Sequence, residues 1–141
     1  MPYCKIMVHA IWSTKNRKPL ITKELRPILL KHIKDNSLVK GIHIDTLNCV
    51  SDHIHLLLSL GTDQTISKAI GLIKGESSNW INKQNLINLK FEWQEEYIAL
   101  SVSSSAVDKV RGYISKQEEH HKKKTFAEEY QAFIKASGLI V

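Results

Sequence analysis

The sequence of 141 residues predicts one α+β domain built on an antiparallel sheet. Three observations favour this class. Short β-rich apolar runs and amphipathic helical runs follow one another in the order βαββαβ. No internal repeat and no long stretch rich in Pro, Gly or Ser divides the chain, whose length is that of about one domain. The composition, 43% hydrophobic and 24% charged, is typical of a globular protein and excludes disordered or collagen-like chains.

The first half of the chain predicts three strands and one helix. Residues 3–12 form a β-rich apolar run, and the basic segment 13–19 follows as a loop. Thr22 is suited to cap a helix, because the apolar residues after it recur at helical spacing. Residues 40–50 and 53–60 predict two strands, and the short polar link between them predicts a hairpin.

The second half predicts helices around two further strands. A helix is expected from residue 65 to about residue 84, where each glycine lowers helix propensity by ~1 kcal/mol and packing must compensate. Short strands are expected at residues 91–93 and 97–102. A helix is expected from about residue 105 to residues 117–121, and a last helix over residues 125–136.

This order predicts a ferredoxin-like or RRM-like βαββαβ sandwich, in which both helices of the core cover one face of the sheet. The single domain spans residues 1–141, with a core at 1–104 and C-terminal helices within 105–141. We expect the second face of the sheet to be free for a ligand or a partner. No apolar run approaches the ~18 residues of a membrane span, and two cysteines make no disulfide framework. A cytoplasmic protein without a membrane partner is therefore expected.

The charge distribution indicates a polyanionic partner. The net charge is +6, and residues 1–34 alone hold eight basic residues against one acidic residue, Glu24. Clustered positive charge favours nucleic acid, because neutralised phosphates release their condensed counterions. A basic surface that only keeps the protein in solution is the alternative, and charge does not decide between the two.

The sharpest local feature is the run DHIHLLLSL at residues 52–60. Side chains alternate along a strand, so His53 and His55 share one face and the aliphatic residues share the other. Because the aliphatic face must pack on helices, two imidazoles remain side by side on the opposite face. Such a pair can ligate one divalent cation. The alternative is two polar residues on a solvated face.

A second feature is the spacing of Tyr113 and Gln117 on the helix that follows residue 105. The two lie four residues apart and are neighbours on one face. Gln117 falls beside the inward apolar stripe, where an amide needs a partner, and a metal ion would provide one. A tyrosine at an interface with a water-bonded glutamine is the alternative. Tyr97 and Tyr130 are rival nucleophiles, and His121 is a rival third ligand.

Together these residues resemble a known family, the single-tyrosine HUH transposases of the insertion-sequence-200/605 type. The resemblance rests on His-hydrophobic-His on a strand, followed about sixty residues later by Tyr-x-x-x-Gln on a helix. It extends over nearly the whole chain, through the segments SKAIGLIKGESSNWIN, WQEEYIALSVS and YISKQEEHHKK and an N-terminal strand with His9 and Trp12. Ser51 stands where the family pattern has proline.

The resemblance implies a DNA transposase that cleaves and rejoins single-stranded DNA at the ends of an insertion element. His53, His55 and Gln117 would be the metal ligands, Tyr113 the nucleophile, and Mg²⁺ or Mn²⁺ the ion. A free tyrosine has a pKa of ~10 and needs help to attack, which Lewis-acid polarisation of the phosphate supplies. The 5′-phosphotyrosine intermediate conserves bond energy, so one nucleophile can cut and rejoin strands.

The resemblance also implies partners. It points to a homodimer that recognises subterminal hairpins, needs no nucleotide cofactor and acts in a prokaryotic cytoplasm, at the nucleoid when DNA is bound. By analogy, the DNA contacts would come from the basic N-terminal loop and from the 65–84 helix. The candidates are Lys15, Arg17, Lys18, Lys68, Lys74, Ser77, Ser78 and Asn79.

Two alternatives to the transposase stay open. One is a domesticated HUH nuclease acting on repeated hairpins or at an origin. The other is a non-catalytic RRM-like module that binds nucleic acid. RRM sheets stack bases on aromatic residues, whereas residues 53–60 offer histidines and no aromatic residues.

Overall fold

A computed structural model of the chain describes residues 3–121 and 124–138, and it confirms the predicted fold class. Four strands form one sheet in the order β2-β3-β1-β4, and all neighbours are antiparallel. This is the strand order of the predicted βαββαβ sandwich. The strands are β1 (Ile6–Ser13), β2 (His43–Cys49), β3 (His53–Leu60) and β4 (Ile98–Val102).

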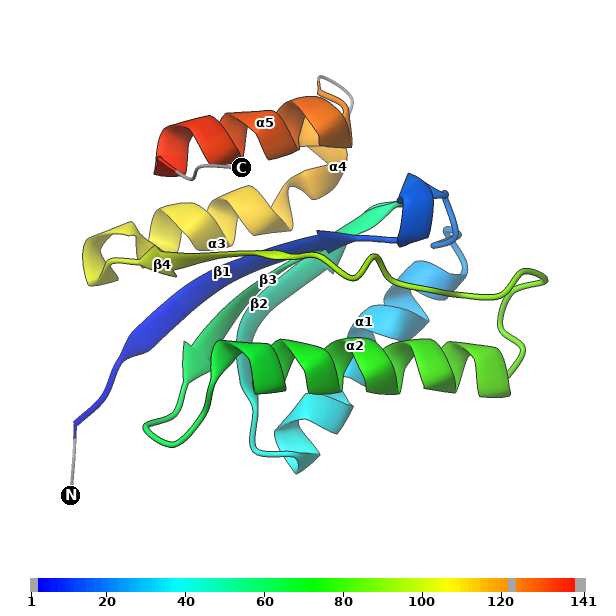
Figure 1. Cartoon of the computed structure of the whole chain (residues 1–141), viewed down its shortest axis with the longest axis horizontal. Coiled ribbons are helices and arrows are strands. Elements are labelled where there is room, and N and C mark those ends of the chain that lie inside the picture. Colours follow the sequence, from blue (N-terminus) through cyan, green and yellow to red (C-terminus); the bar gives the residue numbers. More distant parts are fainter. Residues whose placement is uncertain (1–2, 122–123, 139–141) are drawn as a thin grey trace.

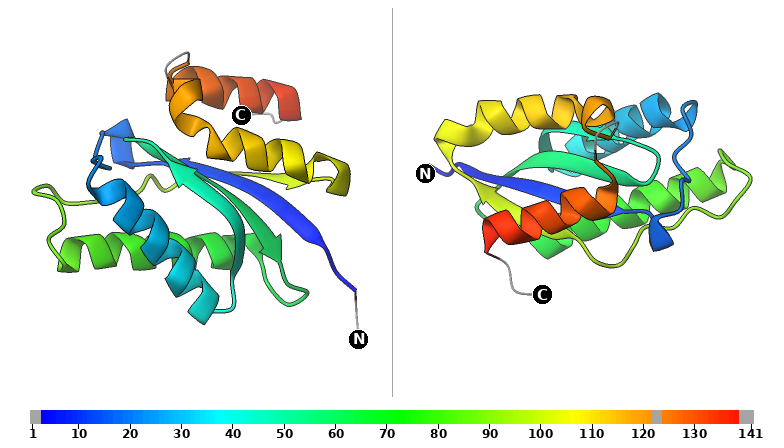
Figure 2. Two further views of the ribbon diagram at one scale, coloured as in Figure 1. Left: turned by 180° about the vertical axis from the view of Figure 1, so that it is seen from behind. Right: turned by 90° about the horizontal axis from the view of Figure 1, so that it is seen from above.

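The helices divide between the two faces of the sheet (Figure 1). One face is covered by α1 (Leu25–Val39) and α2 (Ile66–Lys83). The view from behind in Figure 2 shows the same two layers. The opposite face carries the C-terminal helices, which are α3 (Val107–Ser115), α4 (Gln117–His121) and α5 (Phe126–Ser137).

The covered second face corrects the expectation that this face is free. The C-terminal helices bring their own apolar stripes to it. Val107 and Ile114 of α3 pack with Leu57 of β3, and Phe126 of α5 packs with Ile11 of β1. Because this apolar surface is removed from water, docking of the helices is favourable. A ligand on this face would therefore lie beneath helices and not on an open sheet.

The alternation predicted for residues 53–60 is confirmed. Ile54 and Leu56 are fully buried and belong to the main core, which packs against α1 and α2. The two histidines and Leu57 point to the face that carries α3 and α5. The turn before β3 is closed by a hydrogen bond from Val50 N to His53 O at 3.1 Å, with Ser51 in place of the expected proline.

Several element boundaries follow from local chemistry. The Thr65 side chain accepts a hydrogen bond from Lys68 N and starts α2 at the predicted place. Thr125 forms a capping box with Glu128 and starts α5. The prediction of a strand at residues 91–93 is wrong, because these residues form only a single bridge, between Trp93 and Thr14. The Asn82 side chain instead binds both backbone groups of Phe91, so they are not available to a sheet.

The expected helix over residues 105–121 is divided. A 3-10 turn, η2 (Ser104–Ala106), precedes α3, and the helix breaks at Lys116 before α4 begins. A second 3-10 turn, η1 (Lys15–Arg17), forms the basic loop, and Asn16 and Arg17 both have φ near +56°. Within the described ranges, no helix is both long enough and apolar enough to cross a membrane.

Polar contacts hold α3 against the sheet. The Arg111 guanidinium donates to both carboxylate oxygens of Asp45 in β2, at 2.8 and 2.7 Å. The Asn48 side chain donates to the Ile114 and Ser115 carbonyl oxygens and accepts from Arg26 of α1. Bidentate pairs of this kind are geometrically specific, so they fix the position of the helix that carries Tyr113.

We expect the substitution Asp45→Asn to destabilise the protein only above acidic pH. The hydrogen bonds with Arg111 hold the pKa of Asp45 at about 2, below its ordinary 3.8. The carboxylate therefore contributes stability that is complete above about pH 4 and is lost as the pH falls toward 2. Chemical denaturation of both proteins from pH 2 to 7 measures the difference. Asp108→Asn is the control, because Asp108 contacts the same guanidinium but is exposed. A difference that stays constant with pH would contradict the assignment.

Candidate active site

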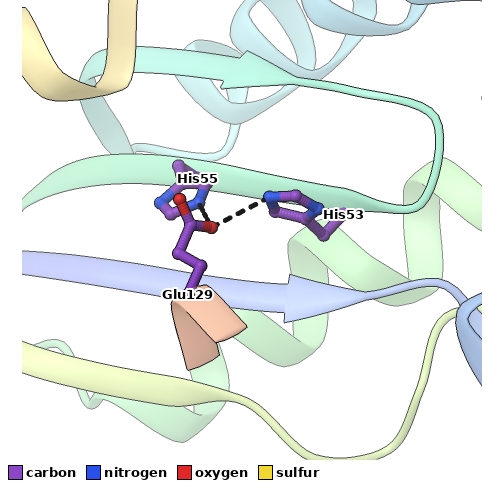
Figure 3. A group of neighbouring side chains, drawn as sticks. All are labelled: His53, His55 and Glu129. Carbon is purple, nitrogen blue, oxygen red and sulfur yellow. Dashed lines mark hydrogen bonds and ion pairs between the residues drawn. The ribbon is translucent and has the colours of Figure 1, made fainter. Parts of the chain in front are cut away.

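The two predicted histidines converge on one point beneath α5. His53 and His55 lie on β3 and are fully buried. Their Nε2 atoms lie 3.1 and 2.9 Å from the same carboxylate oxygen, Oε1 of Glu129, as Figure 3 shows. Two imidazole nitrogens that face one point are arranged like the ligands of a metal ion. Here the carboxylate oxygen occupies the point that they share.

Each imidazole is oriented through its other nitrogen. His53 Nδ1 lies 2.9 Å from an oxygen of Asp52, and His55 Nδ1 lies 2.9 Å from Nε2 of His9. A hydrogen bond to the second nitrogen fixes the tautomer and the ring orientation of metal-binding histidines. The sequence analysis placed His9 on the N-terminal strand but gave it no part in the site.

Glu129 belongs to this cluster, although the sequence analysis gave it no role. It is only 4% exposed. The start of α5 places Phe126, Glu129, Tyr130 and Phe133 on one helical face, and Phe126 and Phe133 pack near the histidine rings. A carboxylate within an aromatic stripe was the available signal, since a buried charge needs a partner.

Tyr113 completes the cluster from the side of α3. It is half-buried, and its hydroxyl donates a hydrogen bond to Oε2 of Glu129. Its ring lies edge-on to His55, with ring centroids 5.7 Å apart. The structure thus brings the predicted nucleophile and both predicted imidazoles around a single carboxylate. The rivals Tyr97 and Tyr130 both line a cavity beside this cluster.

Gln117 lies next to Tyr113 and is fully buried. Its Nε2 donates to the Tyr113 carbonyl oxygen at 3.4 Å, whereas its buried Oε1 has no hydrogen-bond partner among the described residues. A buried amide oxygen without a partner costs free energy, which coordination of a cation would offset. The side chain of His121, the rival third ligand, lies outside the described residues.

The electrostatics of the cluster follow from burial and from charge. Burial alone would raise the pKa of Glu129, but hydrogen bonds from both histidines and from Tyr113 outweigh it and lower the pKa. Burial would lower the pKa of His53, yet Asp52 and Glu129 together raise it. Burial, followed by the neighbouring His55, lowers the pKa of His9 to about 3. Burial and then Glu129 raise the pKa of Tyr113 well above its ordinary value.

The donor set fits a divalent cation. Among the described residues, His53, His55 and Glu129 offer ligand atoms within 4.8 Å of one another. Imidazole nitrogens with carboxylate or amide oxygens suit Mn²⁺ and related ions. Both Nε2 atoms face the carboxylate, so an ion bound through these nitrogens would displace hydrogens and release protons.

The residues predicted to contact DNA separate into two groups. Lys15, Arg17 and Lys18 are exposed on η1 and the residue after it. The others lie on α2, on the opposite face of the sheet from α3 and α5 (Figure 1). Lys68 and Asn79 are exposed there and Ser78 is half-buried.

Two residues of the α2 group are already engaged within the protein. The ammonium of Lys74 donates to the carbonyl oxygens of Gln94 and Glu95, at 2.5 and 2.8 Å. Ser77 is fully buried, donates to the Ile73 carbonyl oxygen and accepts from the Trp93 indole. The structure therefore leaves Ser77 no surface for a DNA contact, which corrects that assignment.

The matched family agrees with this geometry. A family model described as "Transposase IS200 like" matches residues 3–117. The chain belongs to this family. The IS200-like match ends at Gln117, so α5 and Glu129 lie beyond it.

Individual relatives give the same result. The "ISDra2 transposase TnpA" of Deinococcus radiodurans is 28% identical over 115 residues, which cover 77% of this chain and 81% of the relative. A solved structure from Deinococcus radiodurans, assigned as a transposase, has a TM-score of 0.67 and 24% identity, covering 82% of this chain and 93% of that one. The REP-associated tyrosine transposase bound to a REP hairpin has a TM-score of 0.64 and 17% identity, covering 86% of this chain and 72% of that one. These two structures show a shared fold.

We expect His9→Ala to weaken Mn²⁺ binding by ~10- to 100-fold, the usual cost of losing the partner that orients a ligating imidazole. Titration of the purified protein with Mn²⁺, followed by calorimetry, measures the affinity. His43→Ala is the matched control, because His43 is exposed on β2 and away from the cluster. Equal affinities of the His9 and His43 variants would show that His9 does not orient His55.

Proposed function

We propose that this IS200-like transposase cleaves and rejoins single-stranded DNA with Tyr113 as the nucleophile. The observation that carries the proposal is the meeting of the Tyr113 hydroxyl and two imidazole Nε2 atoms at one buried carboxylate. A nucleophile and a cation site so close together suit attack on a phosphodiester. The membership of the family supports the same reaction class.

The proposed ligands are His53, His55 and Gln117, and the proposed ion is Mg²⁺ or Mn²⁺. Among the residues that the structure describes, none partners the Oε1 of Gln117, and this supports its inclusion, because coordination would satisfy it. When bound, the ion supplies Lewis-acid polarisation of a phosphate oxygen. Glu129 is the competing third ligand, since its carboxylate already lies between the two imidazoles.

The proposed reaction is a transesterification. A bond forms between the Tyr113 hydroxyl oxygen and phosphorus, and the bond from phosphorus to the 3′-oxygen breaks. The products are a 5′-phosphotyrosine and a free 3′-hydroxyl. Glu129 accepts the hydrogen bond of the phenol, so its carboxylate is the nearest acceptor for the phenol proton. The 3′-hydroxyl of another strand reverses the step, and strands are joined without an external energy source.

Recognition of subterminal hairpins is part of the proposal. A structural neighbour is the REP-associated tyrosine transposase bound to a REP hairpin, which supports hairpin DNA as a partner. Lys15, Arg17 and Lys18 supply exposed positive charge near the site. The proposed homodimer rests on the family resemblance alone.

The same neighbour favours a second candidate function, a nuclease that acts on repeated hairpins. The chemistry would be identical, and only the DNA context would differ. Paired terminal hairpins around the gene favour transposition, whereas dispersed hairpins favour the nuclease. The RRM-like alternative is not favoured, because helices cover the sheet face on which an RRM would stack bases (Figure 2).

We expect Tyr113→Phe to abolish covalent protein–DNA adducts on a single-stranded oligonucleotide while hairpin binding survives, because only the nucleophilic oxygen is removed. Adducts are detected by intact mass after incubation with Mg²⁺ or Mn²⁺, and hairpin affinity by fluorescence anisotropy. Tyr97→Phe and Tyr130→Phe are the controls for the rival tyrosines and should retain adducts. Adducts that persist in Tyr113→Phe would assign the nucleophile elsewhere.

We expect the variants Gln117→Ala and Glu129→Gln to distinguish the residue that binds the ion from the residue that accepts the Tyr113 proton. Gln117→Ala should weaken Mn²⁺ binding by at least ~10-fold, as the loss of a ligand requires. Glu129→Gln should keep Mn²⁺ affinity but slow adduct formation by ~10²- to 10⁴-fold, the typical share of a general base. Mn²⁺ calorimetry and single-turnover kinetics measure the two effects. The reverse pattern would make Glu129 the ligand.

A further inference from the structure

A cavity of about 480 Å³ opens beside the histidine cluster, between the end of β1, the η1 loop, the segment before β4 and α5. We name it the Arg17 pocket. Its walls include Ser13, Arg17, Gln94, Tyr97, Phe126 and Tyr130. A volume of this size is within the range of small-ligand sites. Neither the proposed ligands nor the proposed nucleophile lines it.

The pocket runs along the β1 side of the imidazole pair and extends past its His53 end. Phe126, which forms one wall, stacks on His53 with ring centroids 4.3 Å apart. Ile11 and Ser13, two further lining residues, are the partners of His55 and His53 in the β1–β3 register, and the lining continues from Ser13 into the η1 loop. The Tyr113 ring lies 5.7 Å from His55 and 6.3 Å from His9. The part of the pocket beyond Ser13 therefore points away from Tyr113.

This placement has a stereochemical consequence for phosphoryl transfer. The attacking and leaving oxygens lie roughly in line through phosphorus. A phosphate held at the imidazoles and attacked by Tyr113 therefore directs its leaving 3′-oxygen toward the Arg17 pocket. The nucleotide that owns this oxygen would extend into the pocket.

The lining of the pocket suits an unstacked base. The Arg17 guanidinium lies over the rings of Phe126 and Tyr130, 5.2 and 5.9 Å from their centroids, and the residue Tyr97 is 37% exposed. Planar side chains of this kind stack on bases, whose faces are all π surfaces. Gln94 and Glu96 add polar groups at the rim that can meet the edges of a base.

The approach of a phosphate requires one local rearrangement. The Glu129 carboxylate occupies the space between the imidazoles. A glutamate side chain has three rotatable bonds, so the carboxylate can leave this space while Phe126 and Tyr130, on the same helix, keep their places. Rotation of this side chain does not by itself alter the pocket, because Glu129 does not line it.

We propose that the Arg17 pocket holds the base of the nucleotide on the 3′-hydroxyl side of the cleaved bond. The inference rests on the proposed function. After cleavage, the bound base keeps the released 3′-hydroxyl beside the phosphotyrosine, where this hydroxyl can reverse the step. The hydroxyl leaves only when the base unstacks.

Photochemical cross-linking tests the placement. The wild-type protein first defines the cleavage position on single-stranded DNA with Mg²⁺ or Mn²⁺. Strands that end at this position in a 3′-hydroxyl then carry 5-iodouracil either at the last nucleotide or four nucleotides before it. The full-length Tyr113→Phe protein is irradiated with each strand and mapped by peptide mass. We expect cross-links to Tyr97 or Tyr130 from the last nucleotide and not from the earlier one.

Binding affinities test the stacking itself. We expect Tyr130→Leu and Arg17→Lys each to weaken binding of the product strand by ~5- to 100-fold, the range for loss of one base–aromatic stack. Arg17→Lys keeps the charge, so a loss there reports stacking and not phosphate attraction. Tyr3→Leu is the control, because Tyr3 is fully exposed outside the pocket. An abasic last nucleotide should weaken binding by the wild type more than it weakens binding by Tyr130→Leu, which has already lost one of the stacking partners.

The outcomes separate the two proposals. Cleavage by the wild type, combined with cross-links that map elsewhere or affinities that neither variant changes, overturns the Arg17 pocket and leaves the proposed function in place. Absence of cleavage with both ions overturns both proposals. Cross-links at Tyr97 or Tyr130 that are equal for the two iodouracil positions overturn the assignment to the last nucleotide.

Discussion

The arrangement of the second face of the sheet depends on one requirement: the two buried imidazoles that β3 places side by side on this face need polar partners. Polar groups withdrawn from water must be paired, and the pairing here is complete on both sides of the rings. Asp52 and His9 hold the Nδ1 atoms, and Glu129 meets the Nε2 atoms. Tyr113 joins through the second oxygen of the same carboxylate. The docking of α3 and α5 on the sheet therefore depends on the hydrogen bonds that the histidines of β3 require.

The parts of the fold that were predictable from the sequence are those that depend on local periodicity and local caps. The period-two pattern of residues 53–60 places the histidines on one face whatever the rest of the chain does. Thr65 starts α2 because its hydroxyl can reach the backbone of Lys68, a contact within one turn. Tyr113 and Gln117 remain neighbours, as their four-residue spacing predicts, although the helix breaks at Lys116 between them. The Gln117 side chain still contacts the Tyr113 backbone.

The parts that were not predictable depend on where a distant segment docks. Glu129 looks like a solvated residue until α5 is placed over the histidines, because only then does its carboxylate acquire buried partners. The same holds for Ser77, whose burial depends on the packing of Trp93 against α2. Residues 91–93 have strand-like composition, but the Asn82 side chain takes both backbone hydrogen bonds of Phe91, the first of them. Tertiary contacts override local preference in each case.

The match to the family model ends before the last helix. Residues 3–117 contain the sheet, the two histidines, Tyr113 and Gln117, whereas Glu129 lies on α5, beyond the matched range. The Glu129 carboxylate nevertheless meets both imidazoles and the Tyr113 hydroxyl. A truncation after residue 117 would therefore remove the shared partner of three polar side chains and uncover the apolar residues that α5 shields, so the matched range alone would not rebuild this cluster.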